Sequence, residues 1–149
     1  MWKERLTSIY ADCVFEEPAD PITLEELSSG LDPELPSDLK SLLAETDGLA
    51  FRLVIDPNID LRHGVITVSL VSNMQGVWDD TIRYRSFDPA FNDFVAFGSM
   101  PNGDVLVYRF VGSGEEPDVW VVSHENFSDR HRFASSLDEA LRKILESAE

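Results

Sequence analysis

Short runs of apolar residues, rich in β-branched and aromatic types, occur in the second half of the chain at Phe94–Met100, Val105–Val111 and Val119–Glu125. Such runs suit a pleated, half-buried surface. Asn102-Gly103 separates the first two runs, and because these residue types tolerate positive φ angles, the pair predicts a tight hairpin turn. A polar loop over 112–117 lets the chain reverse again. We therefore expect three strands in an antiparallel meander.

Two earlier segments, Leu49–Ile55 and Val65–Val71, also have the pattern of strands. In the second of these, apolar residues alternate between two faces. The polar loop Asp56–Gly64 separates them. Residues 72–93 are ambiguous. The larger apolar residues of this segment fit either a short helix or an irregular loop. They are Val77, Trp78, Ile82 and Tyr84.

Apolar residues at spacings of three and four predict helices at both ends of the chain. The N-terminal stripe consists of Trp2, Leu6, Ile9, Tyr10 and Cys13. At the C-terminus, Ser136 and Glu139 have the spacing of a capping box. The C-terminal stripe consists of Leu137, Ala140, Leu141, Ile144, Leu145 and Ala148. We expect both stripes to be buried.

Two shorter helices are expected between the N-terminal helix and the first expected strand. Thr23 and Glu26 predict a capping box at the start of one, and Gly30 can end it in a left-handed cap. In the other, Pro36 suits the first helical position and Asp38 complements the positive end of the helix dipole. Its buried stripe consists of Leu39, Leu42 and Leu43.

The order of the elements is helices, then strands, then a helix. This order predicts an α+β fold in which a central antiparallel sheet is flanked by N-terminal helices and a C-terminal helix. A chain of 149 residues is long enough for one domain that buries about two-thirds of the surface exposed when unfolded. We therefore expect a single domain over residues 1–149.

The charge balance narrows the possible partners. The chain has 12 lysine and arginine residues against 28 aspartate and glutamate residues, which gives a net charge of -16. Such a field repels phosphate backbones and anionic lipids, so binding to nucleic acid or to a membrane is disfavoured. A basic partner is favoured, although many cytosolic proteins are acidic only for solubility.

The single cysteine, Cys13, cannot form an internal disulfide or a thiolate metal site, and we expect it in the core. The N-terminus lacks the apolar run of a signal peptide, and no later run has the length needed to cross a bilayer. A cytoplasmic location is therefore expected.

Motifs for metal, cofactor or catalytic chemistry are incomplete. The segment Asp56–Asp60 begins like a calcium loop, but Leu61 occupies the position of the turn glycine. His124-Glu125 lacks the second histidine of a zinc-protease motif, because His131 lies too far along the chain. Phosphate-binding, dinucleotide-binding and serine-nucleophile fingerprints are missing. We expect no cofactor, no metal and no enzymatic activity, although folding could still bring two carboxylates together as a catalytic pair.

Acidic clusters lie in expected loops at Glu16-Glu17-Asp20, Asp79-Asp80 and Glu115-Glu116-Asp118. Loops on a rigid scaffold often carry binding residues, but solvation alone explains any single cluster. Trp78, next to two of these acids, is typical of a hot spot for a basic partner if it is exposed, and of packing if it is buried. The candidate partner-binding residues are Trp78, Asp79, Asp80, Asp56, Asp60, Glu115, Glu116 and Asp118. Trp2 and Trp120 are expected in the core.

Several short motifs follow one another over nearly the whole chain. They are the Trp2 helix, Leu35-Pro36-Ser37-Asp38-Leu39 with Leu42-Leu43, Asp47-Gly48, Phe97-Gly98, Asn102-Gly103-Asp104, Val119-Trp120, His124-Glu125 and the capped C-terminal helix. Their order resembles the SUKH superfamily, whose members include a yeast cell-wall-assembly regulator and many bacterial immunity proteins. Val122 and Ser123 depart from the family, which often has aromatic and acidic residues there, and the loop Asp56–Gly64 looks like an insertion.

The resemblance implies a central antiparallel sheet, no enzymatic activity, and a structural role for His124 and Glu125. It implies an immunity protein that neutralises a cognate nuclease or deaminase domain of a bacterial polymorphic toxin system. The alternative is a regulatory or scaffolding domain related to cell-wall-assembly regulators. Because a nuclease that binds phosphates offers a cationic cleft, the acidic charge independently favours toxin neutralisation.

Overall fold

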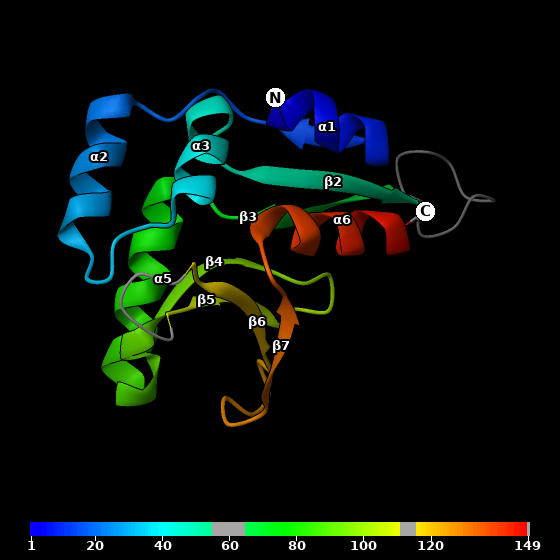
Figure 1. Ribbon diagram of the computed structural model, residues 1–149. Helices are drawn as coiled ribbons and strands as arrows, with labels where there is room; N and C mark the ends of the chain where they lie inside the picture. The colour runs from blue at the N-terminus through cyan, green and yellow to red at the C-terminus, as the bar shows by residue number, and fades with distance from the viewer. Residues whose placement is uncertain (55–64, 111–115, 149) are drawn as a thin grey trace.

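The computed structural model describes residues 1–54, 65–110 and 116–148, and its centre is a seven-stranded antiparallel sheet (Figure 1). The strands follow the chain order β1 to β7, so the expected meander is confirmed and extends over all of them. Their bounds are β1 Cys13–Phe15, β2 Leu49–Val54, β3 Val65–Val71, β4 Phe94–Ser99, β5 Val105–Arg109, β6 Asp118–Val122 and β7 Arg130–Ala134.

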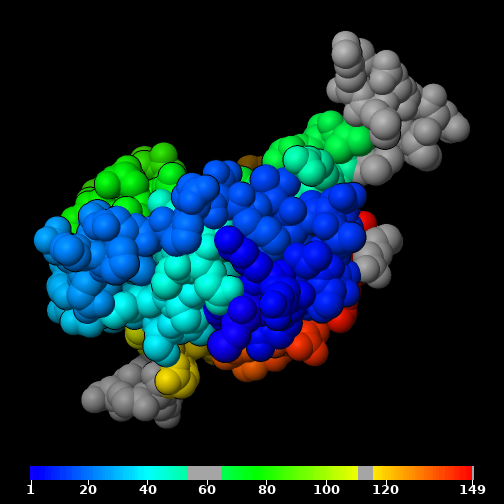
Figure 2. Space-filling model, turned by 90° about the horizontal axis from the view of Figure 1, so that it is seen from above, coloured from blue at the N-terminus to red at the C-terminus, as the bar shows by residue number. Residues whose placement is uncertain are grey.

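Helices cover the sheet and complete an α+β fold, as predicted. They are α1 Trp2–Ile9, α2 Pro21–Gly30, α3 Ser37–Glu45, α5 Met74–Phe87, the 3-10 helix η1 Pro89–Asp93 and α6 Leu137–Ser147. The main core lies between the sheet and the helices, and each of the five described α-helices contributes buried residues to it. Figure 2 shows the face that α1, α2 and α3 form together at the N-terminal side.

The N-terminal helix is shorter than its apolar stripe predicts. The helix ends at Ile9, and Cys13 lies in β1, where it pairs with Phe51 of β2. The prediction that Tyr10 and Cys13 continue the helical stripe is therefore wrong, because pairing with a distant strand determines their conformation. Trp2 and Leu6 are buried as expected, whereas Cys13 is half-buried, and burial together with the nearby charge of Asp12 raises its pKa.

The second helix begins two residues before the predicted position. Asp20, not Thr23, is its N-cap, and the Asp20 carboxylate accepts hydrogen bonds from the backbone N–H and the hydroxyl of Thr23. These bonds lower the pKa of Asp20. The left-handed cap expected at Gly30 does not form, because the C-cap is Leu31 in an extended conformation.

The stripes of α3 and α6 are buried as predicted. Leu39, Leu42 and Leu43 are fully enclosed, and five of the six stripe residues of α6 are buried while Ala148 packs at its edge. The Ser136 hydroxyl caps α6 by accepting from the Glu139 N–H at 3.1 Å. The Glu139 carboxylate instead accepts from the hydroxyl of Ser135, so the capping box forms on one side only. Pro36 is the N-cap of α3 and not its first helical residue.

The hairpin between β4 and β5 uses one glycine. Gly103 adopts a φ of 95°, whereas Asn102 keeps a negative φ, so the expectation of positive angles at both residues is wrong. The Gly103 N–H donates to the Met100 carbonyl at 2.9 Å, and the Met100 N–H donates to the Asp104 carbonyl at 2.7 Å. This geometry is typical of a three-residue hairpin loop with glycine in its last position.

The predicted ambiguity over residues 72–93 resolves into α5, whose N-cap is Asn73, followed by η1. Helix α5 lies beside β4, because β3 and β4 pair only at Val71 and Gly98 and then diverge. Thr81 of α5 supplies hydrogen bonds to the open edge of β4. Its hydroxyl accepts from the N–H of Ala96 and donates to the Ala96 carbonyl. Helix α5 therefore replaces a neighbouring strand along this edge.

Candidate functional site

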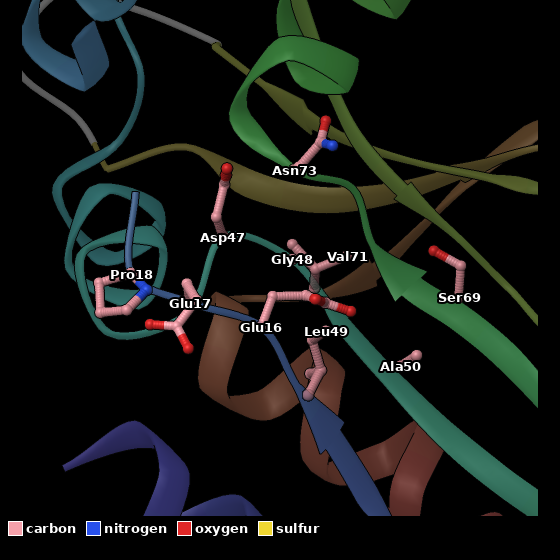
Figure 3. Close-up of a pocket in the computed structure, with 10 residues that line it drawn as sticks. All are labelled: Glu16, Glu17, Pro18, Asp47, Gly48, Leu49, Ala50, Ser69, Val71 and Asn73. Atoms are coloured by element: carbon pink, nitrogen blue, oxygen red, sulfur yellow. The ribbon is translucent and has the colours of Figure 1, made fainter. Parts of the chain in front are cut away.

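A groove of about 590 Å³ lies where the segment after β1 crosses the ends of β2 and β3 (Figure 3). Its lining residues are Glu16, Glu17, Pro18, Asp47, Gly48, Leu49, Ala50, Ser69, Val71 and Asn73. Ala50 and Ser69 are register partners, and they lie on the opposite face of the sheet from their core-facing neighbours Phe51 and Val68. The groove therefore has a floor of small side chains and an acidic rim.

The acidic rim is held in place by the buried residue Thr46. The Thr46 hydroxyl accepts from the Glu16 N–H at 2.8 Å and donates to the Gly48 carbonyl at 2.6 Å. The backbone N–H of Asp47 donates a second hydrogen bond, of 2.8 Å, to the Glu17 carbonyl. Because Thr46 directly follows α3, these bonds fix the segment after β1 relative to the start of β2.

The upper side of the groove is formed by the connection between α3 and β2 and by the start of α5. The Asp47 carboxylate accepts from the Met74 N–H at 2.7 Å, and the Asn73 side chain accepts from the Gly76 N–H at 2.7 Å. Both side chains therefore satisfy N–H groups at the N-terminus of α5. Gly48 adopts a φ of 115°, a conformation that favours glycine, as the chain turns into β2.

Glu16 and Glu17 supply the available negative charge of the groove. Both side chains are exposed. Within the described part of the chain, neither carboxylate has a lysine, arginine or histidine within salt-bridge distance. Two unpaired carboxylates beside a preformed recess can bind an ammonium or guanidinium group through charge-assisted hydrogen bonds.

Trp78, the aromatic residue of the predicted hot spot, lies on α5 outside this groove. Its side chain is half-buried and packs against the main core. It also lies against α2, because a Cβ added at Gly30 would come within 2.9 Å of the Trp78 ring. The absence of a side chain at Gly30 thus makes room for the ring, and much of the Trp78 surface serves packing.

The predicted acidic residues lie in separate places. Asp79 accepts from the Gln75 side chain at 2.9 Å, and Asp80 forms an ion pair with Arg83 at 3.2 Å on the surface of α5. Asp118, at the start of β6, accepts from Trp120 Nε1 and forms an ion pair with Arg132. Glu116 is exposed before β6, while Asp56, Asp60 and Glu115 lie outside the described residues.

Of the partner-binding residues predicted from the sequence, none that the structure describes lines this groove. The cluster Glu16-Glu17 was visible as a loop with several acids, but nothing distinguished it from the other acidic clusters. Asp47 was visible only as part of the Asp47-Gly48 motif after a helix, and Asn73 and Ser69 carried no signal. The hydrogen bonds between Thr46 and both sides of the groove arise between segments that are distant in the sequence.

His124, which was expected to have a structural role, forms hydrogen bonds at the end of β6. His124 donates its backbone N–H to Asp104 Oδ1 at 3.1 Å, and its Nδ1 lies 2.7 Å from the same oxygen. Trp120 was expected in the core, but it is half-buried on the other face of the sheet. Over residues 1–54, 65–110 and 116–148, no group of three histidine, cysteine or acidic side chains is placed to hold a metal ion.

None of the described helices combines the length and apolar character required to span a membrane.

Together, the fold and the groove define an α+β protein with a seven-stranded antiparallel meander and an acidic recess. Residues 18–143 match the family model of the SMI1 / KNR4 family (SUKH-1), which covers most of the chain. The chain therefore belongs to the SMI1 / KNR4 (SUKH-1) family, as the order of its motifs predicted. The comparison with curated proteins finds no match.

Proposed function

We propose that this chain is a non-catalytic, cytoplasmic binding protein whose acidic groove receives a lysine or arginine side chain of a basic protein partner. The observation that carries the proposal is the pair of exposed carboxylates at Glu16 and Glu17, which form no ion pair with any described residue and lie beside a recess of about 590 Å³. The partner that best fits the family and the charge is a cognate toxin domain with a cationic nucleic-acid-binding cleft. The chain then acts by occlusion of that cleft.

The net charge of -16 supports this proposal through association kinetics. An acidic surface steers a basic partner toward encounter, and this effect raises the association rate most at low ionic strength. The groove itself adds specificity, because its small floor residues let a long cationic side chain enter between the two carboxylates and the start of α5. Binding is therefore expected to depend on both the total charge and these particular positions.

Affinity capture with charge-matched variants tests the proposal. The tagged protein is incubated with its native lysate, and the retained proteins are identified by mass spectrometry and released with a salt gradient. The double variant Glu16→Gln/Glu17→Gln should release a basic partner at lower salt than the unmodified chain. The control Glu4→Gln/Glu146→Gln makes the same change of charge at exposed positions outside the groove and should leave the release point nearly unchanged.

A third variant, Asp79→Asn/Asp80→Asn, tests the surface of α5 beside Trp78, which remains a second candidate contact region. If the groove and control variants lose the partner equally, net charge alone drives capture and the groove proposal is wrong. Capture of one basic toxin-like domain supports neutralisation. Capture of cell-wall or signalling proteins instead supports the regulatory or scaffolding alternative that the family also contains.

A further inference from the structure

Arginine side chains gather on one face of the strands β4 to β7, although the chain as a whole is strongly acidic. Arg109 pairs in register with Phe94 on one side, and Arg132 pairs with Trp120. Arg130 pairs with Val122. Because directly opposed residues share a face of a sheet, these arginines lie on the face that carries the second apolar cluster. We call Arg109, Arg130 and Arg132, with the rings of Phe94 and Trp120, the arginine face.

Two of these guanidinium groups lie over aromatic rings. The Cζ atom of Arg109 is 4.7 Å from the centroid of the Trp120 ring, and that of Arg130 is 5.3 Å from the Phe94 centroid. Both arginines are half-buried. Stacking of this kind restricts a guanidinium to one plane, so its N–H donors are already oriented for a planar acceptor such as a carboxylate.

The acid opposite Arg109 is already engaged. Asp118 is the register partner of Arg109 on β6, but its Oδ1 accepts from Trp120 Nε1 at 2.8 Å and its Oδ2 accepts from Arg132 Nε at 3.0 Å. Considering the described residues alone, neither Arg109 nor Arg130 has a carboxylate within salt-bridge distance. Asp118 therefore orders Trp120 and Arg132 and leaves the two stacked guanidinium groups available.

An exposed apolar side chain continues this surface. Ring contacts connect Phe94 to Phe91 at 5.4 Å, Phe91 to Phe127 at 5.8 Å, and Phe127 to Phe87 at 6.4 Å. Phe87, at the end of this series, is 71% exposed. Arginine and aromatic residues are the types most enriched at the centres of protein interfaces.

We propose that the arginine face binds an acidic segment of a protein partner, with carboxylates on Arg109 and Arg130 and an apolar side chain against Phe87. Nucleic acid is the other source of anions, but its dense phosphate charge is repelled by a chain of net charge -16. A short peptide carries only a few charges and experiences much less repulsion. This surface is opposite in sign to the acidic groove, and the proposal is independent of the groove.

The test uses the full chain and a short dye-labelled peptide in which glutamates flank one phenylalanine. Fluorescence anisotropy at about 0.1 M salt measures affinity, and the NMR signal of the Trp120 indole N–H reports the location. The double variant Arg109→Gln/Arg130→Gln should weaken binding by about tenfold or more, because charge-assisted hydrogen bonds to both arginines are lost. Circular dichroism checks that the variant is folded.

Two further variants distinguish recognition from charge. Arg109→Lys/Arg130→Lys keeps the charge but not the planar donors, and it should still lose several-fold in affinity. Arg142→Gln/Lys143→Gln on α6 removes the same two positive charges outside the arginine face, and this variant should bind the peptide like the unmodified chain. Equal loss in this control overturns the proposal, as does a peptide that leaves the Trp120 signal unmoved. Binding of a short DNA duplex at Trp120 in place of the peptide also overturns it.

Discussion

The phenol oxygen of Tyr108 on β5 lies 3.0 Å from Oδ1 of Asp38 on α3, 70 residues earlier in the chain. The same carboxylate accepts from the Leu39 N–H at 2.8 Å and from the Leu137 N–H at 3.3 Å. One acidic side chain thus connects α3, the centre of the sheet and the start of α6. Asp38 was predicted only as a favourable charge at a helix N-terminus, and its role in joining three elements became visible only in the tertiary structure.

Replacing Asp38 with alanine should destabilise the protein by about 3 kcal/mol. The change leaves the fully buried Tyr108 hydroxyl without its acceptor and removes two bonds to helix N-termini. The single variant Tyr108→Phe removes the donor of this hydrogen bond and should lower the free energy of unfolding by about 1 kcal/mol. Urea denaturation measures both values. In the double variant Asp38→Ala/Tyr108→Phe the two costs should not add, and strict additivity would show that the pair is not coupled.

Stability should decrease at alkaline pH through Tyr108. Burial, and then the nearby charge and hydrogen bond of Asp38, raise the pKa of Tyr108 well above its usual range. The folded state therefore holds the phenol proton more tightly than the unfolded state, whose pKa is about 10. The stabilisation is fully present below that value and is lost progressively as the pH rises above it. The Tyr108→Phe variant should show a shallower loss of unfolding free energy above about pH 10.

Asp104 should have the opposite dependence on pH. Hydrogen bonds from the His124 ring, and then from its backbone N–H, lower the pKa of Asp104. Its contribution to stability is therefore present above the unfolded pKa of about 3.9, and it is lost as the pH falls through the lower folded value. His124→Ala should move the pKa of Asp104 back toward its ordinary value in a carbon-13 NMR titration of the carboxyl group. His131→Ala serves as the control, and an equal shift there would contradict the assignment.

Gly98 should not tolerate even an alanine. A Cβ at this position would lie 2.0 Å from the Leu70 carbonyl oxygen, at the single register pair that joins β3 to β4. Since backbone must move to relieve the clash, Gly98→Ala should cost more than about 3 kcal/mol in thermal or urea denaturation. Gly76→Ala in α5 is the comparison. Its nearest contacts, Asn73 Oδ1 and Ser72 Cβ at 3.1 Å, need to move by only a few tenths of an ångström, so its cost should be clearly smaller. A similar cost at both positions would exclude this explanation.

The regular elements that depend on nearby residues were predicted well, whereas the exact caps and turns were predicted less well. The bounds of β3 agree with the expected Val65–Val71, and the predicted stripe of α6 is buried. These elements follow from alternation, from helical spacing and from the cap at Ser136, which are all local. The start of α2 was harder, because Asp20 and Thr23 are both good cap residues and only three positions separate them.

Features that depend on distant pairing were not predictable in the same way. Cys13 continues the spacing of a helix, yet it pairs with Phe51 of β2, and that pairing determines its conformation. Helix α5 has a weak pattern because its buried side includes Thr81, a polar residue that bonds to the edge of β4. A hydrophobicity pattern cannot identify a buried polar residue whose partner lies on another element.

The sequence by itself determined the fold class, the family and the acidic character of the surface, because these depend on composition, local periodicity and the order of motifs. The tertiary structure decided which acids share a site. Glu16 and Glu17 flank a groove because Thr46 bonds to Glu16 and Gly48 at once, whereas Asp118 is occupied by Trp120 and Arg132. Whether a carboxylate is free or already paired depends on neighbours brought together by folding, and no spacing along the chain reveals it.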